Sequence, residues 1–176
     1  MNRIIVSLGL MVALSGPALT CIAHLEGQPA LRLDGRLHLG PRVPSFDESK
    51  GRIVLLFFWA HWCADCKADS ATVAAIVEKY RSQGLTIIAP TRRYGFIGGG
   101  RPAAPDRELR HLVDVRDADY AFLRDQPIPI SDANYERYGV DAIPTYVLID
   151  KQGVIRLFHP GRMAQDELAA AIRPLL

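Results

Sequence analysis

The stretch that decides the fold of this chain is Ile53-Val54-Leu55-Leu56-Phe57-Phe58-Trp59-Ala60-His61-Trp62-Cys63-Ala64-Asp65-Cys66. Its apolar first part, 53–59, is typical of a strand buried on both faces. An amphipathic pattern follows, so the sequence predicts a helix over about 63–81. Residues three apart lie on one face of a helix, where two cysteines can pair without much movement of the backbone. The stretch therefore predicts reversible thiol–disulfide chemistry.

The two cysteines are expected to have different roles. Cys63 falls at the helix N-terminus, where unpaired backbone N–H groups and the positive end of the helix dipole favour a thiolate. Cys66 lies one turn further in and is more shielded. We therefore expect Cys63 to attack and Cys66 to resolve. A cross-link that closes so short a loop adds little stability, which favours a redox role over a structural one.

Length and composition are those of a single domain. The chain has 176 residues, 49% of them hydrophobic, which is enough for one packed core. Its 21 basic and 19 acidic side chains give a net charge of only +2 and are interspersed. No basic stripe indicates a nucleic-acid partner.

The first 23 residues resemble an export signal. Arg3 supplies a short positive region, 4–14 is apolar, and small residues at Cys21 and Ala23 fit cleavage before His24. We expect segment 1–23 to be a signal peptide and the folded domain to lie outside the cytoplasm, in a periplasm or secreted. Disulfides persist in such a compartment.

Two alternatives for this segment remain open. Segment 1–23 could be retained as a membrane anchor, although Gly16 and Pro17 interrupt it. Cys21 could instead carry a lipid. In all three cases Cys63 and Cys66 are the expected redox pair.

The rest of the chain alternates between strand and helix signals. Residues 24–50 are expected to be an extended lead-in with a strand near 37–39, and 85–89 a second buried strand. The later elements expected are a helix over 106–124 capped by Asp106, a bridging segment at 128–130, a helix over 132–138, a strand over 145–149, a hairpin turn at 150–153, a strand over 154–158, and a final helix carrying Leu168, Ile172 and Leu175. This order predicts an α/β domain over 51–176, with a central mixed sheet flanked by helices on both faces.

Segment 91–105 is unusual because it contains Gly98-Gly99-Gly100 and two prolines. Triple glycine disfavours helix and strand, so we expect a flexible surface loop that tunes the choice of partner. A phosphate-binding role is disfavoured, because the lysine and serine of a P-loop are missing.

Three landmarks together resemble the thioredoxin superfamily, and within it the exported TlpA- and ResA-like thiol–disulfide reductases. They are the run 58–66 with its CxxC motif, the segment Gly139-Val140-Asp141-Ala142-Ile143-Pro144-Thr145, and Asp150-Lys151-Gln152-Gly153 before the last hairpin strand. Their order and spacing match the family from about Gly51 onward. The resemblance implies a thioredoxin-like fold.

The resemblance also implies a client-binding edge. Ile143–Pro144 is then a cis peptide packed against the disulfide, and the backbone before Pro144 pairs with an extended client chain. Trp62, Ile143, Pro144 and Thr145 are the implied binding residues, with Trp62 shielding the disulfide. A trans proline that merely opens a strand is the alternative.

Several positions depart from the family pattern. Phe57 stands where cytoplasmic thioredoxins carry a buried Asp, and Asp69 stands where exported reductases often carry Glu. Asp69 is therefore either a shortened active-site carboxylate or a solvated one. Asp65, inside the motif, disfavours the Cys63 thiolate. Lys67 and a protonated His61 could offset it, and the sequence leaves the net sign open.

By resemblance, the chain is an enzyme that needs no cofactor beyond its Cys63–Cys66 disulfide. It would reduce disulfides of extracytoplasmic client proteins, with electrons from a membrane-embedded thiol protein. Three alternatives remain: an oxidase that donates disulfides, a CxxC metal site with His61, and a non-catalytic interaction module. Four ligands are usual for structural zinc, and no second cysteine pair is present after residue 66.

Overall fold

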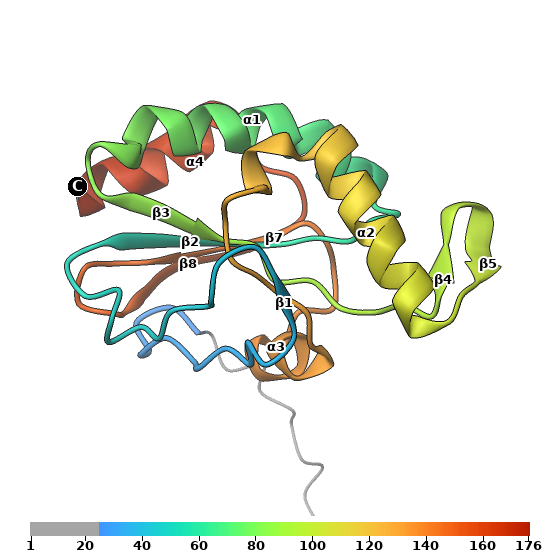
Figure 1. The fold of residues 1–176 in the computed structure, drawn as a ribbon. Coiled ribbons are helices and arrows are strands. Elements are labelled where there is room, and N and C mark those ends of the chain that lie inside the picture. Colours follow the sequence, from blue (N-terminus) through green and yellow to red (C-terminus); the bar gives the residue numbers. More distant parts are fainter. Residues whose placement is uncertain (1–24) are drawn as a thin grey trace, which may run out of the picture.

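The computed structural model of the chain describes residues 25–176 (Figure 1). The hypotheses on cleavage, anchoring and lipidation concern segment 1–23 and lie outside the described residues. Among residues 25–176, no helix combines the length and apolar character that crossing a membrane requires.

A four-stranded mixed sheet forms the centre of the domain, with strand order β3-β2-β7-β8. Strand β2 (Ile53–Phe58) pairs in parallel with β3 (Leu85–Ile88) and antiparallel with β7 (Thr145–Ile149). Strand β8 (Ile155–Pro160) pairs antiparallel with β7. The predicted α/β fold with a mixed sheet is confirmed.

Helices cover both faces of this sheet (Figure 1). Helices α1 (Ala64–Arg81) and α4 (Gln165–Ile172) lie on one face, and α3 (Asp132–Tyr138) lies on the other. A short 3-10 turn, η3 (Arg173–Leu175), follows α4. Alternate residues of β2 enter two cores, because successive strand side chains point to opposite faces. Ile53, Leu55 and Phe57 join the core beneath α1 and α4, and Val54, Leu56 and Phe58 join the core beside α3.

The lead-in is tied to the α3 side of the domain. Strand β1 (His38–Leu39) pairs antiparallel with β6 (Ile128–Pro129). The fully buried Asn134 side chain bonds both backbone groups of Asp34, at 2.7 Å from its N–H and 3.0 Å to its carbonyl. The Tyr138 hydroxyl donates to the Leu31 carbonyl at 2.6 Å. These bonds pair backbone groups of an extended segment that has few ladder partners of its own.

The expectation that the triple glycine keeps 91–105 free of helix and strand is wrong. The segment contains a small hairpin of β4 (Phe96–Ile97), the 3-10 turn η1 (Gly98–Gly100) and β5 (Arg101–Pro102). Gly99 and Gly100 have φ values of 73° and 71°, in the left-handed region that glycine enters readily. The glycines therefore form the tight turn of a hairpin.

The helix expected over 106–124 has different bounds. Helix α2 runs over Pro105–Asp119, and the 3-10 turn η2 (Ala121–Leu123) follows it. Asp106 is not its cap: Ala104 is the extended N-cap residue, and Pro105 takes the first turn, where its missing N–H has no cost. The helix ends because Tyr120 has φ −135° and ψ 44°, outside the helical region.

Removing the Tyr138 hydroxyl tests the tether of the lead-in. We expect Tyr138→Phe to lower the free energy of unfolding by about 1 kcal/mol, because the Leu31 carbonyl loses its partner. Urea denaturation measures this change. Tyr80→Phe is the control. The Tyr80 ring is buried to a similar degree in the core beneath α1, and its hydroxyl forms no hydrogen bond with any of residues 25–176. Equal effects of both substitutions would contradict the assigned tether.

Candidate active site around the Cys63–Cys66 disulfide

Cys63 and Cys66 form a disulfide at the start of α1. Cys63 is the extended N-cap residue of this helix, and its Sγ accepts a hydrogen bond from the Cys66 N–H at 3.0 Å. Cys63 is 6% exposed and Cys66 is fully buried. A disulfide partner can therefore reach Cys63 first, and the helix N–H groups favour its thiolate once the disulfide is reduced.

The segment that leads from β2 to Cys63 is held from three sides. The Trp59 indole donates to the Ala89 carbonyl at 3.2 Å. The Trp59 carbonyl accepts from Thr91 Oγ1 at 2.8 Å and from the Tyr135 hydroxyl at 2.7 Å. Because Tyr135 lies on α3, this one carbonyl joins the segment after β2 to helix α3.

The proline segment lies at the same end of the sheet as the cysteines, because Thr145 pairs with Phe58 in the β2–β7 register. The Ile143–Pro144 peptide is cis. Thr145 Oγ1 donates to the Ala142 carbonyl at 2.7 Å, which closes the turn before β7. Trp62 is 49% exposed at this end, with its ring edge-on to Tyr94 at 5.3 Å between centroids.

His61 is buried away from solvent, with only 1% of its side chain exposed. Its Nε2 lies 3.5 Å from Glu108 Oε1, and the rings of Tyr94, Phe96 and His111 lie edge-on around it. Burial lowers the pKa of His61, the nearby His111 lowers it further, and Glu108 opposes both effects. The burial of the ring therefore disfavours its charged form.

Glu108 is a buried carboxylate that the sequence analysis missed. Its Oε1 accepts from the Tyr94 N–H and its Oε2 from the Gly95 N–H at 3.0 Å. One turn later on α2, His111 Nε2 accepts from the Gly98 N–H at 3.3 Å. The two side chains bind α2 to the main chain of the β4–β5 hairpin. Their spacing of three residues, typical of one helix face, was the available signal.

Of the two charged residues nearest the cysteines, Lys67 is paired with a neighbour and Asp65 is exposed. Lys67 Nζ lies 2.8 Å from Asp119 Oδ1 at the end of α2. Asp65 is exposed in the first turn of α1. The structure therefore directs the Lys67 charge to Asp119, and it buries the His61 ring against Glu108.

The interpretation of Asp69 as a solvated carboxylate is wrong. Asp69 is 2% exposed. It accepts from the Tyr146 hydroxyl at 2.8 Å, from Arg162 Nε at 2.7 Å and from the Met163 N–H at 3.3 Å. Burial raises the pKa of Tyr146, so its hydroxyl remains a donor to Asp69. Three bonds thus hold the carboxylate between α1, β7 and the segment before α4.

Phe57 stands where the sequence comparison with cytoplasmic thioredoxins places a buried Asp. It is fully buried and packs on Tyr146 with ring centroids 5.5 Å apart. Within residues 25–176, no group of three or more His, Cys, Asp or Glu residues is placed to hold a metal ion.

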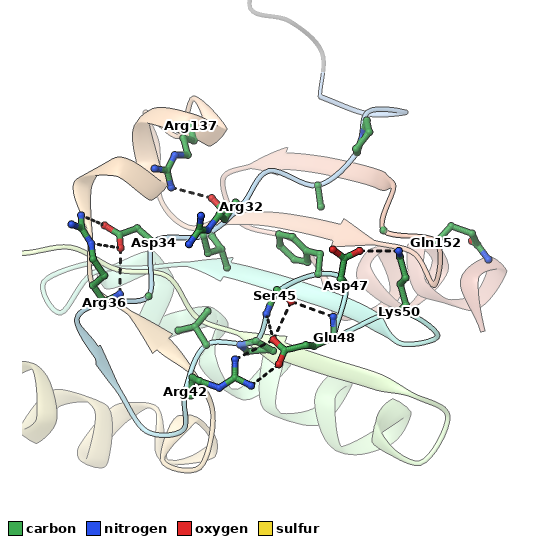
Figure 2. A pocket seen from close by; sticks show the side chains of 18 residues that line it. Arg32, Asp34, Arg36, Arg42, Ser45, Asp47, Glu48, Lys50, Arg137 and Gln152 are labelled. Atoms are coloured by element: carbon green, nitrogen blue, oxygen red, sulfur yellow. Dashed lines mark hydrogen bonds and ion pairs between the residues drawn. The ribbon is translucent and has the colours of Figure 1, made fainter.

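A hollow of about 980 Å³ lies away from the disulfide, between the lead-in, α3 and the β7–β8 turn (Figure 2). Figure 2 shows its acidic side chains paired with basic neighbours: Asp34 with Arg36, Glu48 with Arg42, and Asp47 with Lys50. Neither cysteine nor any residue of the proline segment lines it. The disulfide chemistry is therefore separate from this hollow.

Comparison with known proteins agrees with this geometry. Residues 46–175 match the family described as thioredoxin-like domain. The thioredoxin-like protein YneN of Bacillus subtilis is 27% identical over 143 residues, which cover 81% of this chain and 76% of that protein. The thiol-disulfide oxidoreductase ResA of Halalkalibacterium halodurans is 26% identical over 130 residues, covering 72% and 66% of the two chains.

The fold also occurs in a solved structure, that of a thiol-disulfide isomerase from Corynebacterium glutamicum. It superposes with a TM-score of 0.67 at 17% identity, over 84% of this chain and 96% of that one. With the CxxC disulfide at the start of its first helix and a family match over most of its length, the chain belongs to the thioredoxin-like proteins and is a thiol–disulfide oxidoreductase.

Proposed function

We propose that the chain is a reductase of disulfides in extracytoplasmic client proteins. The observation that carries this proposal is the Cys63–Cys66 disulfide, in which Cys63 is slightly exposed, at 6%, and Cys66 is fully buried. A purely structural cross-link needs no such difference in access between its two cysteines.

The reaction has two exchange steps. The Cys63 thiolate attacks one sulfur of the client disulfide, that S–S bond breaks, and the other client sulfur leaves as a thiolate. The Cys66 thiolate then attacks Cys63 Sγ, which releases the second client thiolate and forms the Cys63–Cys66 disulfide. The dithiol loses two electrons and the client disulfide gains two, so no further cofactor is required.

Client binding is proposed to use the edge formed by Trp62, Ile143, Pro144 and Thr145. The support is that Ile143 is half-buried and its backbone forms no hydrogen bond with another described residue. Its N–H and C=O are therefore available to an extended client chain, in the manner of an added strand. The exposed Trp62 ring supplies an apolar surface next to Cys63 in the sequence.

The charges around Cys63 support the proposed direction of electron flow. A thiolate stabilised by cations makes a CxxC disulfide oxidising, because the reduced form is then favoured. Here Lys67 is paired with Asp119 and burial disfavours the protonated form of His61, while Asp65 adds a negative charge at the helix start. This arrangement favours the disulfide over the thiolate, which is the property of a reductant.

The same protein needs a source of electrons after each turnover. We propose a membrane-embedded thiol protein for this role and an extracytoplasmic location, periplasmic or secreted, with a membrane anchor as the alternative. The support is the signal-like pattern of 1–23. A disulfide-donating oxidase is the second candidate function, favoured by the hydrogen bond from the Cys66 N–H to Cys63 Sγ.

The assigned order of attack predicts a trapped intermediate. In a Cys21→Ser background, reduced Cys66→Ser is expected to accumulate a mixed disulfide with insulin, because nothing displaces the client from Cys63. Cys63→Ser is expected to accumulate none, since the remaining sulfur is fully buried. Non-reducing electrophoresis followed by mass spectrometry measures both. A comparable adduct on Cys66 in Cys63→Ser would contradict the assigned roles.

The reductase proposal predicts a low reduction potential. Equilibration of the protein with defined thiol–disulfide buffers is expected to give a value near or below the thioredoxin value of about −270 mV. A value towards about −120 mV, typical of a disulfide donor, would reverse the proposed direction.

Asp65 is expected to contribute to that potential. Asp65→Asn removes a negative charge from the helix start, where charge effects are about 0.3–1 kcal/mol, so the potential should become less negative by about 6–20 mV. Glu78→Gln is the control, because Glu78 is an exposed acid near the far end of the same helix. An equal shift in both variants would mean that net charge, and not the position of Asp65, sets the potential.

A further inference from the structure

A small cavity of about 70 Å³ lies directly beside the client-binding edge. Trp62 and Ile143 form its wall on the side of the disulfide and the proline segment. Tyr94, Tyr135, Arg92 and Asp141 complete the part of the lining that matters here. Its volume corresponds to about two water molecules, so it admits a small polar group and not a large ring.

The Arg92 side chain is held in a fixed position in this cavity. Its guanidinium carbon lies 5.2 Å from the Tyr94 ring centroid and 4.7 Å from that of Tyr135. Tyr135 is itself fixed by its bond to the Trp59 carbonyl. Stacking on two rings orients a planar guanidinium before any partner arrives.

One hydrogen-bond donor of Arg92 lacks a partner among the described residues. Its Nε is buried and has no hydrogen-bond acceptor. Its side chain is 38% exposed, and its nearest carboxylate oxygen is Asp132 Oδ1, 3.6 Å from Nη1. That distance exceeds a hydrogen bond, and the Asp132 side chain is 66% exposed. Asp141 is exposed at the rim, where solvent and salt screen its charge.

We propose that this cavity is a subsite for an acidic side chain of the client, close to its reactive cysteine, with Arg92 as the specificity-determining residue. The inference rests on the proposed function, because it requires a client chain at the edge beside Pro144. A carboxylate matches the forked donors of a guanidinium and forms charge-assisted hydrogen bonds with them. Alternate side chains of an extended client point to the same side, so a residue near the cysteine can enter the cavity.

Synthetic peptides with one cysteine, activated as its uncharged 2-pyridyl disulfide, test this subsite. Each peptide carries a single Glu or Gln at one of the four positions nearest the cysteine. The reduced protein attacks the disulfide, and released 2-thiopyridone reports the second-order rate constant. For at least one position we expect the Glu peptide to react at least about threefold faster than its Gln partner, as an ion pair of about 0.7 kcal/mol gives.

The variants then assign the preference to Arg92. Arg92→Gln is expected to reduce the Glu-to-Gln ratio to about one, and Arg92→Glu to invert it. Arg93→Gln is the matched control: it removes the same charge from the exposed next residue and should keep the ratio. A ratio of one for the unchanged protein at every position, or an equal loss in Arg93→Gln, would overturn the subsite. Absence of thiopyridone release from all peptides would instead contradict the proposed reductase.

Discussion

The complete burial of β2 is the constraint on which the rest of the structure depends. Its six residues alternate between two cores, so a shift by one residue would move each set of side chains into the core shaped for the other set. The chain leaves this strand at Trp59, whose carbonyl accepts from both Thr91 and Tyr135. The position of Cys63 is thus determined by packing on both faces of the sheet, and its sulfur lies beyond the carboxyl-terminal end of an inner strand.

Local patterns predicted the elements whose formation depends on local sequence. A few neighbouring residues are enough to predict the apolar run of β2, the paired cysteines and the strands of the last hairpin. The mixed sheet follows from their order. The triple glycine misled, because glycine indicates both an irregular loop and a tight turn with positive φ, and composition does not distinguish these.

The electrostatics of the site could not be predicted, because they depend on partners distant in sequence. Asp69 binds Arg162, 93 residues away, and Lys67 pairs with Asp119. His61 faces Glu108 in a pocket that forms only when α2 and the β4–β5 hairpin fold against the active-site segment. Sequence alone shows which charges are present, while the fold decides which of them remain near the sulfur.

The attachment of the β4–β5 hairpin has a consequence for how this family member can diversify. Glu108 and His111 accept from main-chain N–H groups of Tyr94, Gly95 and Gly98, and not from hairpin side chains. Main-chain attachment is indifferent to most side chains beyond Phe96, which itself packs on His61. The side chains at the exposed end of the hairpin can therefore change while the hydrogen bonds from its main chain to helix α2 are kept.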